Sequence, residues 1–269
     1  MIDKEDYQEQ CCLLKMNQGG EKIPVSRVLE KLDVYLENQD FEGARRHLDY
    51  WEQEAEGYKD YQGELSVINE KIGFYRKQGD EAMCLAQIPR AFGLIEQLGM
   101  EDTITHGTTL INAATGYKAF NQGSTALPLY EKAKRIYESA LRPEDSRLGG
   151  LYNNMALALV EEADYERALE YYHKALKIME LQDQGELECA ITYLNMADLF
   201  VVRDGQVEAE QEVTKLIEAA IECLNKEDLV KNGYYAFVCE KCAPVFGYYG
   251  YFIYETELKN RAREIYERN

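Results

Sequence analysis

The sequence has few prolines and histidines, and it lacks long apolar runs. Five prolines and three histidines occur in 269 residues. The longest strongly apolar stretch without a charge spans positions 242–254 and contains a proline and two glycines. It is too short for a membrane-spanning helix, which needs about 18 apolar residues. The glycines of the chain are scattered rather than gathered into a linker. We therefore expect no transmembrane helix and one continuous folded body.

Positive charge is also scarce. Lysine and arginine total 30 against 49 aspartates and glutamates, a formal net charge of −19. An acidic surface repels phosphate backbones and anionic lipid headgroups, so neither nucleic acid nor membrane is an expected partner. The acidity serves solubility in the simplest interpretation, and a basic protein partner is the alternative.

Recognisable catalytic and metal-binding motifs are missing. The sequence contains no H-E-x-x-H, G-x-S-x-G, P-loop or G-x-G-x-x-G pattern. Its single C-x-x-C pair, Cys239 and Cys242, has neither the second pair nor the nearby histidine that a tetrahedral zinc site requires. We predict a protein that is not an enzyme and uses no metal or cofactor. The alternative is a thiol- or metal-dependent enzyme centred on Cys239 and Cys242.

The cysteine count and the first residues bear on the compartment. Seven cysteines are an odd number, and the chain starts MIDKEDYQEQ, which is acidic and polar. A secretory signal starts with basic residues followed by an apolar segment. These features predict a reducing cytoplasm with free thiols.

A helical repeat is the clearest positive feature. In residues 149–181, two segments joined by a short turn each carry apolar residues on one helix face, the first at i, i+3, i+4 and i+7 and the second at i, i+4, i+7 and i+8. Small residues at Ala156 and Ala168 would let the two antiparallel helices approach closely. The apolar positions are Tyr152, Met155, Ala156, Leu159, Ala168, Tyr172, Ala175 and Leu176.

The pattern recurs along the chain with a period of about 42 residues, which lies in the range of helical repeat arrays. Ala126 precedes Ala168 at this spacing, Ala209 follows it, and Ala44 occupies the matching place in the first copy. The second copy is degenerate, and the last one is atypical, as expected of a terminal repeat. The second copy offers Ala82, Cys84 and Ala86 for its close helix contact, and the last copy offers Gly250, Ala262 and Tyr266.

The copy at residues 149–181 resembles the tetratricopeptide repeat (TPR), with a large residue, N-x-A and A-x3-Y-x2-A in order. It departs from the family at Glu180 and Leu181, near the usual proline. The period exceeds the family's usual value of about 34 residues. Kinesin light chain and the peptide-pheromone regulators of Gram-positive bacteria have similarly long repeats, so we suspect a bacterial relative.

The resemblance implies an all-α fold, a right-handed α-α superhelix of about six antiparallel helical hairpins. Residues 1–22 would form an N-terminal extension or capping helix, and residues 23–232 five hairpins. Residues 233–269 would form a divergent, aromatic-rich capping hairpin.

The resemblance also implies a concave groove lined by the first helix of each hairpin. Two residues before the packing alanine stand Asn112, Asn154 and Asn195, with Asn69 in the degenerate copy. An amide can donate to and accept from a peptide backbone without reading its sequence. Alternatively, these asparagines bond a neighbouring helix. The same alignment of the repeats places further residues in the groove, namely Ile111, Leu157, Val160, Glu161, Leu194, Asp198, Val201 and Val202.

The C-terminal region is unusually aromatic. Nine of the positions from 234 to 254 hold an aromatic residue. Core packing of a long helix would explain this density, and so would a surface for a partner or for self-association. The candidate surface residues are Tyr234, Tyr235, Tyr248, Tyr249 and Tyr251.

Taken together, these features predict a non-catalytic scaffold that binds a protein or an extended peptide in its groove. A structural oligomer that self-associates is a further alternative to the enzyme.

Overall fold

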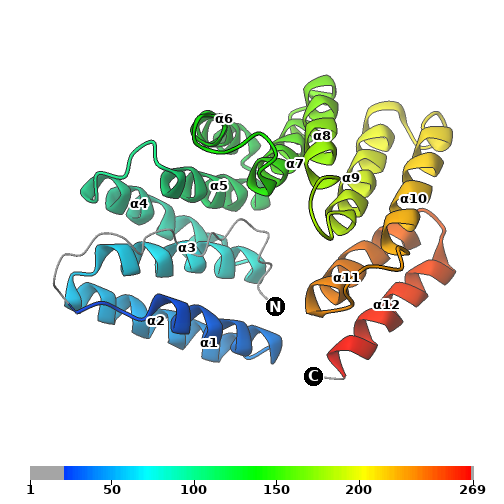
Figure 1. The fold of residues 1–269 in the computed structure, drawn as a ribbon. Helices are drawn as coiled ribbons and strands as arrows, with labels where there is room; N and C mark the ends of the chain where they lie inside the picture. The colour runs from blue at the N-terminus through cyan, green and yellow to red at the C-terminus, as the bar shows by residue number, and fades with distance from the viewer. Residues whose placement is uncertain (1–20, 268–269) are drawn as a thin grey trace. The chain divides into compact units, whose positions relative to one another are not determined.

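The computed structural model describes residues 21–267, which form twelve α-helices and no β-strand (Figure 1). None of these helices is long and apolar enough to cross a membrane. The prediction of an all-α fold is confirmed, and of the predicted N-terminal extension only residues 21 and 22 lie within the described range. The helices are α1 (Val25–Glu37), α2 (Phe41–Tyr58), α3 (Tyr61–Gln78), α4 (Glu81–Gln97), α5 (Ile104–Ala119), α6 (Gly123–Ala140), α7 (Ser146–Glu161), α8 (Tyr165–Met179), α9 (Glu186–Asp204), α10 (Glu210–Leu224), α11 (Gly233–Tyr248) and α12 (Phe252–Tyr266).

Consecutive helices pack in pairs, from α1 with α2 to α11 with α12, which confirms the prediction of six helical hairpins. Contacts divide the described part of the chain into two compact units, with the boundary between Arg142 and Pro143. Each unit contains three of the described hairpins. In the first unit α3 packs against α2, α4 and α5, and in the second α9 packs against α8, α10 and α11. The first helix of a middle hairpin thus contacts both neighbouring hairpins of its unit.

Aspartate side chains begin several helices. Each accepts a hydrogen bond from a backbone N–H three residues later, which satisfies one of the unpaired donors of a helix start. The residue before each aspartate has a left-handed φ, so the chain reverses within a short turn. At Ala163 this φ is 58°, a conformation that is costly for a residue with a Cβ. These aspartates are Asp40, Asp60, Asp80 and Asp164.

The small residues of the repeat lie where the sequence pattern places them. Ala126, Ala156 and Ala168 have no exposed surface, and Ala209 is 2% exposed. A bulky side chain at these positions would have no space between the helices. Gly250 is an exception, because it lies in the turn between α11 and α12 with a φ of 86° and not at a helix contact.

The degenerate second hairpin uses a cysteine at its close contact. Cys84 is fully buried, whereas Ala82 and Ala86 are exposed. The Cys84 thiol donates to the backbone oxygen of Ile72 on α3, with 3.4 Å between Sγ and O. Cys84 thus serves as the small, buried residue of this hairpin.

Candidate functional site

Two asparagines join neighbouring hairpins in the first unit. The Nδ2 atom of Asn112 on α5 donates to Oδ1 of Asn69 on α3 at 3.0 Å. Asn69 in turn donates to the backbone oxygen of Leu65 at 3.1 Å and to Oγ1 of Thr109 at 3.2 Å. Both asparagines are half-buried. Their amides therefore link α3 to α5 and keep an accessible edge.

A second pair of asparagines lies in the second unit. The Nδ2 atom of Asn195 on α9 lies 3.4 Å from Oδ1 of Asn153 on α7, and the hydroxyl of Thr192 donates to the same oxygen at 3.3 Å. The structure brings Asn153, and not its neighbour Asn154, to Asn195. Asn154 is half-buried, and its side chain makes no hydrogen bond to any described residue.

The two pairs are built alike. Both α5 and α9 carry the sequence Thr-x-x-Asn, in which the threonine and the asparagine lie one helical turn apart and bond one asparagine of the preceding hairpin. Each amide offers two N–H donors and two acceptor lone pairs, so a single bond to a neighbour leaves Asn112 and Asn195 further capacity. The recurring Thr-x-x-Asn motif is the sequence signal that identifies these pairs.

The apolar residues predicted for the groove separate into two groups. Ile111 and Leu194 are each only 2% exposed, so they pack in the core. Leu157, Val160 and Val201 are half-buried, and Val202 is 60% exposed. Asp198 and Glu161 are exposed. A partly apolar surface with acidic residues beside it therefore lies on α7 and α9.

Comparison with known proteins identifies the architecture. No family model and no curated protein matches the sequence. Solved structures do match. BtubC (BKLC) from P. vanneervenii superposes with a TM-score of 0.52 and 19% identity over 91% of each chain. The kinesin light chain TPR-like repeats of Podosopora anserina give a TM-score of 0.53 and 17% identity over 75% of this chain and 94% of theirs. The chain has a TPR-like fold.

Another TPR-like match is a quorum sensor. NprR from B. thuringiensis in its apo form superposes with a TM-score of 0.56 and 14% identity, covering 91% of this chain and 65% of NprR. NprR in complex with its cognate peptide NprX gives a TM-score of 0.60 and 15% identity, covering 91% of this chain and 68% of NprR. At these identities the similarity establishes the fold.

The aromatic residues of the last TPR-like hairpin are partly buried and partly exposed. Tyr235 is 1% exposed, and its hydroxyl accepts a hydrogen bond from Arg261 at 3.0 Å. Tyr234 is half-buried and donates to Glu188. Tyr248 is 63% exposed. Core packing thus explains some of these residues, and self-association through the others stays a prediction. The remaining candidates, Tyr249 and Tyr251, are half-buried.

The cysteine pair of α11 is poorly placed for thiol chemistry. Cys239 and Cys242 are both buried, and burial raises the pKa of each thiol, that of Cys242 to about 12. The thiolate is the nucleophilic and metal-binding form, so both thiols are protonated at neutral pH. Within residues 21–267 no three His, Cys, Asp or Glu side chains are grouped to hold a metal ion. The geometry therefore gives no support to the enzyme alternative.

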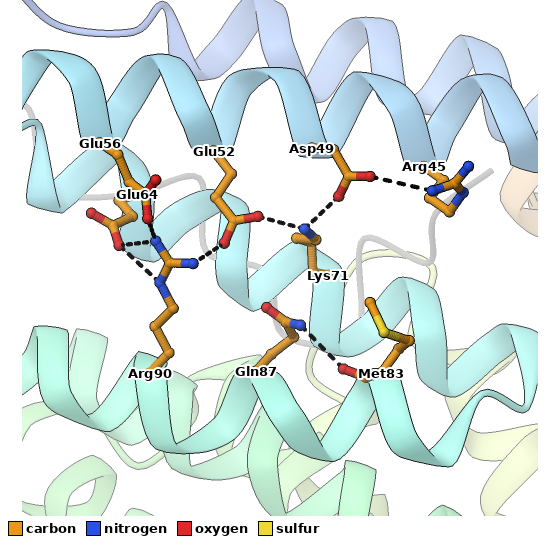
Figure 2. A network of polar contacts seen from close by, with 9 residues as sticks. All are labelled: Arg45, Asp49, Glu52, Glu56, Glu64, Lys71, Met83, Gln87 and Arg90. Atoms are coloured by element: carbon orange, nitrogen blue, oxygen red, sulfur yellow. Dashed lines mark hydrogen bonds and ion pairs between the residues drawn. The ribbon is translucent and has the colours of Figure 1, made fainter.

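A partly buried network of charges connects α2, α3 and α4 of the first unit (Figure 2). Lys71 is 5% exposed and lies between Asp49, at 2.6 Å, and Glu52. Arg90 reaches from α4 to Glu52 at 2.6 Å and to Glu64 at 2.8 Å. Removing one member of such a network leaves its partners buried without compensation. The network joins α2 and α4 to α3, the helix that also carries Asn69.

Proposed function

We propose that the chain binds an extended segment of another protein or a peptide, and that the half-buried asparagines hold the segment's backbone. The observation that carries the proposal is the repetition of the Thr-x-x-Asn arrangement, with Asn112 in the first unit and Asn195 in the second. An amide at the surface can donate to a peptide carbonyl and accept from a peptide N–H.

Two further features support this proposal. The TPR-like neighbour NprR was solved with its cognate peptide NprX, so a chain of this architecture can hold a peptide. The net charge of −19 favours a basic segment, because charge complementarity accelerates encounter and suppresses wrong partners. We assign the chain a binding role and no catalytic one.

Panning a phage-displayed library of random dodecapeptides on the full chain tests the proposal. The affinity of the selected peptides is then measured by calorimetry for the wild type and for Asn112→Ala and Asn195→Ala. Loss of one hydrogen bond should weaken binding about three- to tenfold. Each unit has its own asparagine pair. The selected peptides are therefore assigned to a unit according to which of the two variants weakens their binding.

The matched control is Asn260→Ala, which removes an exposed asparagine from α12. It should leave every affinity unchanged. Thermal unfolding of the variants separates a weakened site from a weakened fold. Selection of no peptide, or selected peptides that bind both asparagine variants as tightly as the control, would refute the proposal.

A further inference from the structure

Tyr172 on α8 carries a buried hydroxyl that has no hydrogen-bond partner among the described residues. The side chain has no exposed surface. Burying a hydroxyl without a partner is unfavourable, and nearly all buried polar groups in folded proteins are paired. An unpaired hydroxyl at a repeat position that could equally hold phenylalanine therefore needs an explanation.

The preceding hairpin shows how such a tyrosine is normally satisfied. Tyr130 and Tyr172 occupy the same place in consecutive hairpins, since each lies one helical turn after its packing alanine. The Tyr130 hydroxyl lies 3.0 Å from Oγ1 of Thr115 on α5. The residue that corresponds to Thr115 in the next hairpin is Leu157, which offers no polar side-chain atom. The second unit thus keeps the tyrosine and lacks its partner.

The charges of two carboxylates act on this unpaired hydroxyl. Burial raises the pKa of Tyr172, and the negative charges of Asp198 and Glu161 raise it further. Asp198 on α9 follows its packing alanine directly, as Leu157 does on α7. The Oδ1 atom of Asp198 accepts a hydrogen bond of 2.6 Å from the hydroxyl of Tyr249, which directly follows α11. Asp198 therefore contacts Tyr249 directly and acts on Tyr172 through its charge.

The environment of Asp198 is suited to a positively charged ligand. The surrounding protein raises the pKa of its carboxyl group, a change that the hydrogen bond from Tyr249 partly offsets. Asp198 nevertheless belongs to the exposed residues, so a ligand can reach it. A cation beside Asp198 would form a charge-assisted hydrogen bond with its carboxylate. It would also bring a polar partner close to Tyr172.

We propose that Asp198, Tyr172 and Tyr249 form a pocket for a lysine or arginine side chain of the bound segment. The ligand's cation pairs with the Asp198 carboxylate, and the Tyr172 hydroxyl accepts a hydrogen bond from it once the side chains that cover this hydroxyl turn aside. This inference rests on the proposed binding function and adds the chemistry of one ligand residue. The pocket lies entirely in the second unit.

The pocket is tested on the full chain labelled with ¹³Cζ-tyrosine, with Nα-acetyl-lysine N-methylamide as the probe. The norleucine analogue, which has no charge, serves as the ligand control. We expect the Tyr172 and Tyr249 signals, assigned through phenylalanine variants, to shift with the lysine probe and not with norleucine. Asp198→Asn keeps the side-chain shape and removes the charge, and should weaken lysine binding roughly tenfold to hundredfold.

Two tyrosine variants distinguish the pocket from a general effect on the fold. Tyr172→Phe removes the unpaired hydroxyl and should weaken binding of the lysine probe severalfold. Tyr130→Phe removes the paired hydroxyl of the other unit and should leave binding unchanged. Equal shifts with both probes, no shift with either, or full binding by Asp198→Asn would overturn the pocket.

The outcomes for the pocket and for the proposed function can be told apart. If selected dodecapeptides bind but show no preference for lysine or arginine, and the probe shifts no tyrosine signal, the pocket is wrong and the binding function stands. If the lysine probe binds as expected and no peptide is selected, the pocket stands and the binding function is wrong.

Discussion

Replacing Lys71 by methionine tests whether the charge network holds the first unit together. The side chain of Lys71 is 6% exposed, and its Nζ bonds both Asp49 and Glu52. Methionine fills a similar volume without a charge. The substitution therefore leaves Glu52, whose side chain is 11% exposed, with one cation fewer in a poorly hydrated place.

The expected loss in the free energy of unfolding follows from how exposed the ion-pair partners of Lys71 are. Removing one member of a buried ion pair costs about 3–5 kcal/mol. Arg90 still bonds Glu52, and Asp49 is a third exposed, so we expect a loss near the lower limit, about 3 kcal/mol. For a chain of this length that corresponds to a decrease in Tm of roughly 6–12 °C.

The assay compares Lys71→Met with Lys215→Met in thermal and urea unfolding. Lys215 forms an ion pair with Glu212 in which both side chains are largely exposed, and such pairs contribute about 0–1 kcal/mol. Hydrogen exchange should place the loss of protection in α2, α3 and α4. Adding Glu52→Gln to Lys71→Met should recover part of the stability, as a double-mutant cycle would reveal. Equal Tm decreases for the two lysine variants would show that the Lys71 ion pairs contribute no more stability than an exposed pair.

Three further predictions concern other parts of the fold. Burial lowers the pKa of His106, whose Nδ1 accepts a hydrogen bond from the backbone N–H of Asp102. As the pH falls, the unfolded chain therefore binds the proton before the folded one does, and the free energy of unfolding should decrease below about pH 6.5. In urea unfolding, His106→Gln should make this pH dependence smaller. Ala163→Gly should stabilise the chain by about 0.5 kcal/mol, because glycine adopts its φ of 58° without strain; a lower Tm would contradict this. Ala168→Arg should cost about 3 kcal/mol or more, because a charge enters a contact with no exposed surface; an unchanged Tm would contradict the repeat register.

The helical repeat could be predicted from the sequence because its determinants are local. Ala126, Ala168 and Ala209 recur at a nearly constant spacing, and each allows two adjacent helices to approach closely. Only the structure showed that Cys84, and not Ala82 or Ala86, forms the close helix contact of the second hairpin. Alternate residues on a helix point in different directions, and the degenerate copy gave no pattern to show which direction faces α3.

The asparagine pairs show where sequence reasoning reaches its limit. Asn153 and Asn154 are adjacent, so they point about 100° apart around α7, and only the orientation of α7 relative to α9 selects Asn153 as the partner of Asn195. The charge network has no periodic signal, since Arg90 meets Glu52 across 38 residues. Long-range polar contacts of this kind depend on packing between helices, which a repeat pattern does not specify.

In the proposed function, asparagine amides bond the backbone of a bound segment. The most direct test is a cycle that combines a selected peptide, its single-ester analogues and the Asn195→Ala variant, with affinities from calorimetry. An ester removes one backbone N–H donor without changing the side chains. We expect one ester position that weakens binding to the wild type about three- to tenfold and has no further effect on Asn195→Ala. Ester and alanine effects that simply add at every position would contradict it.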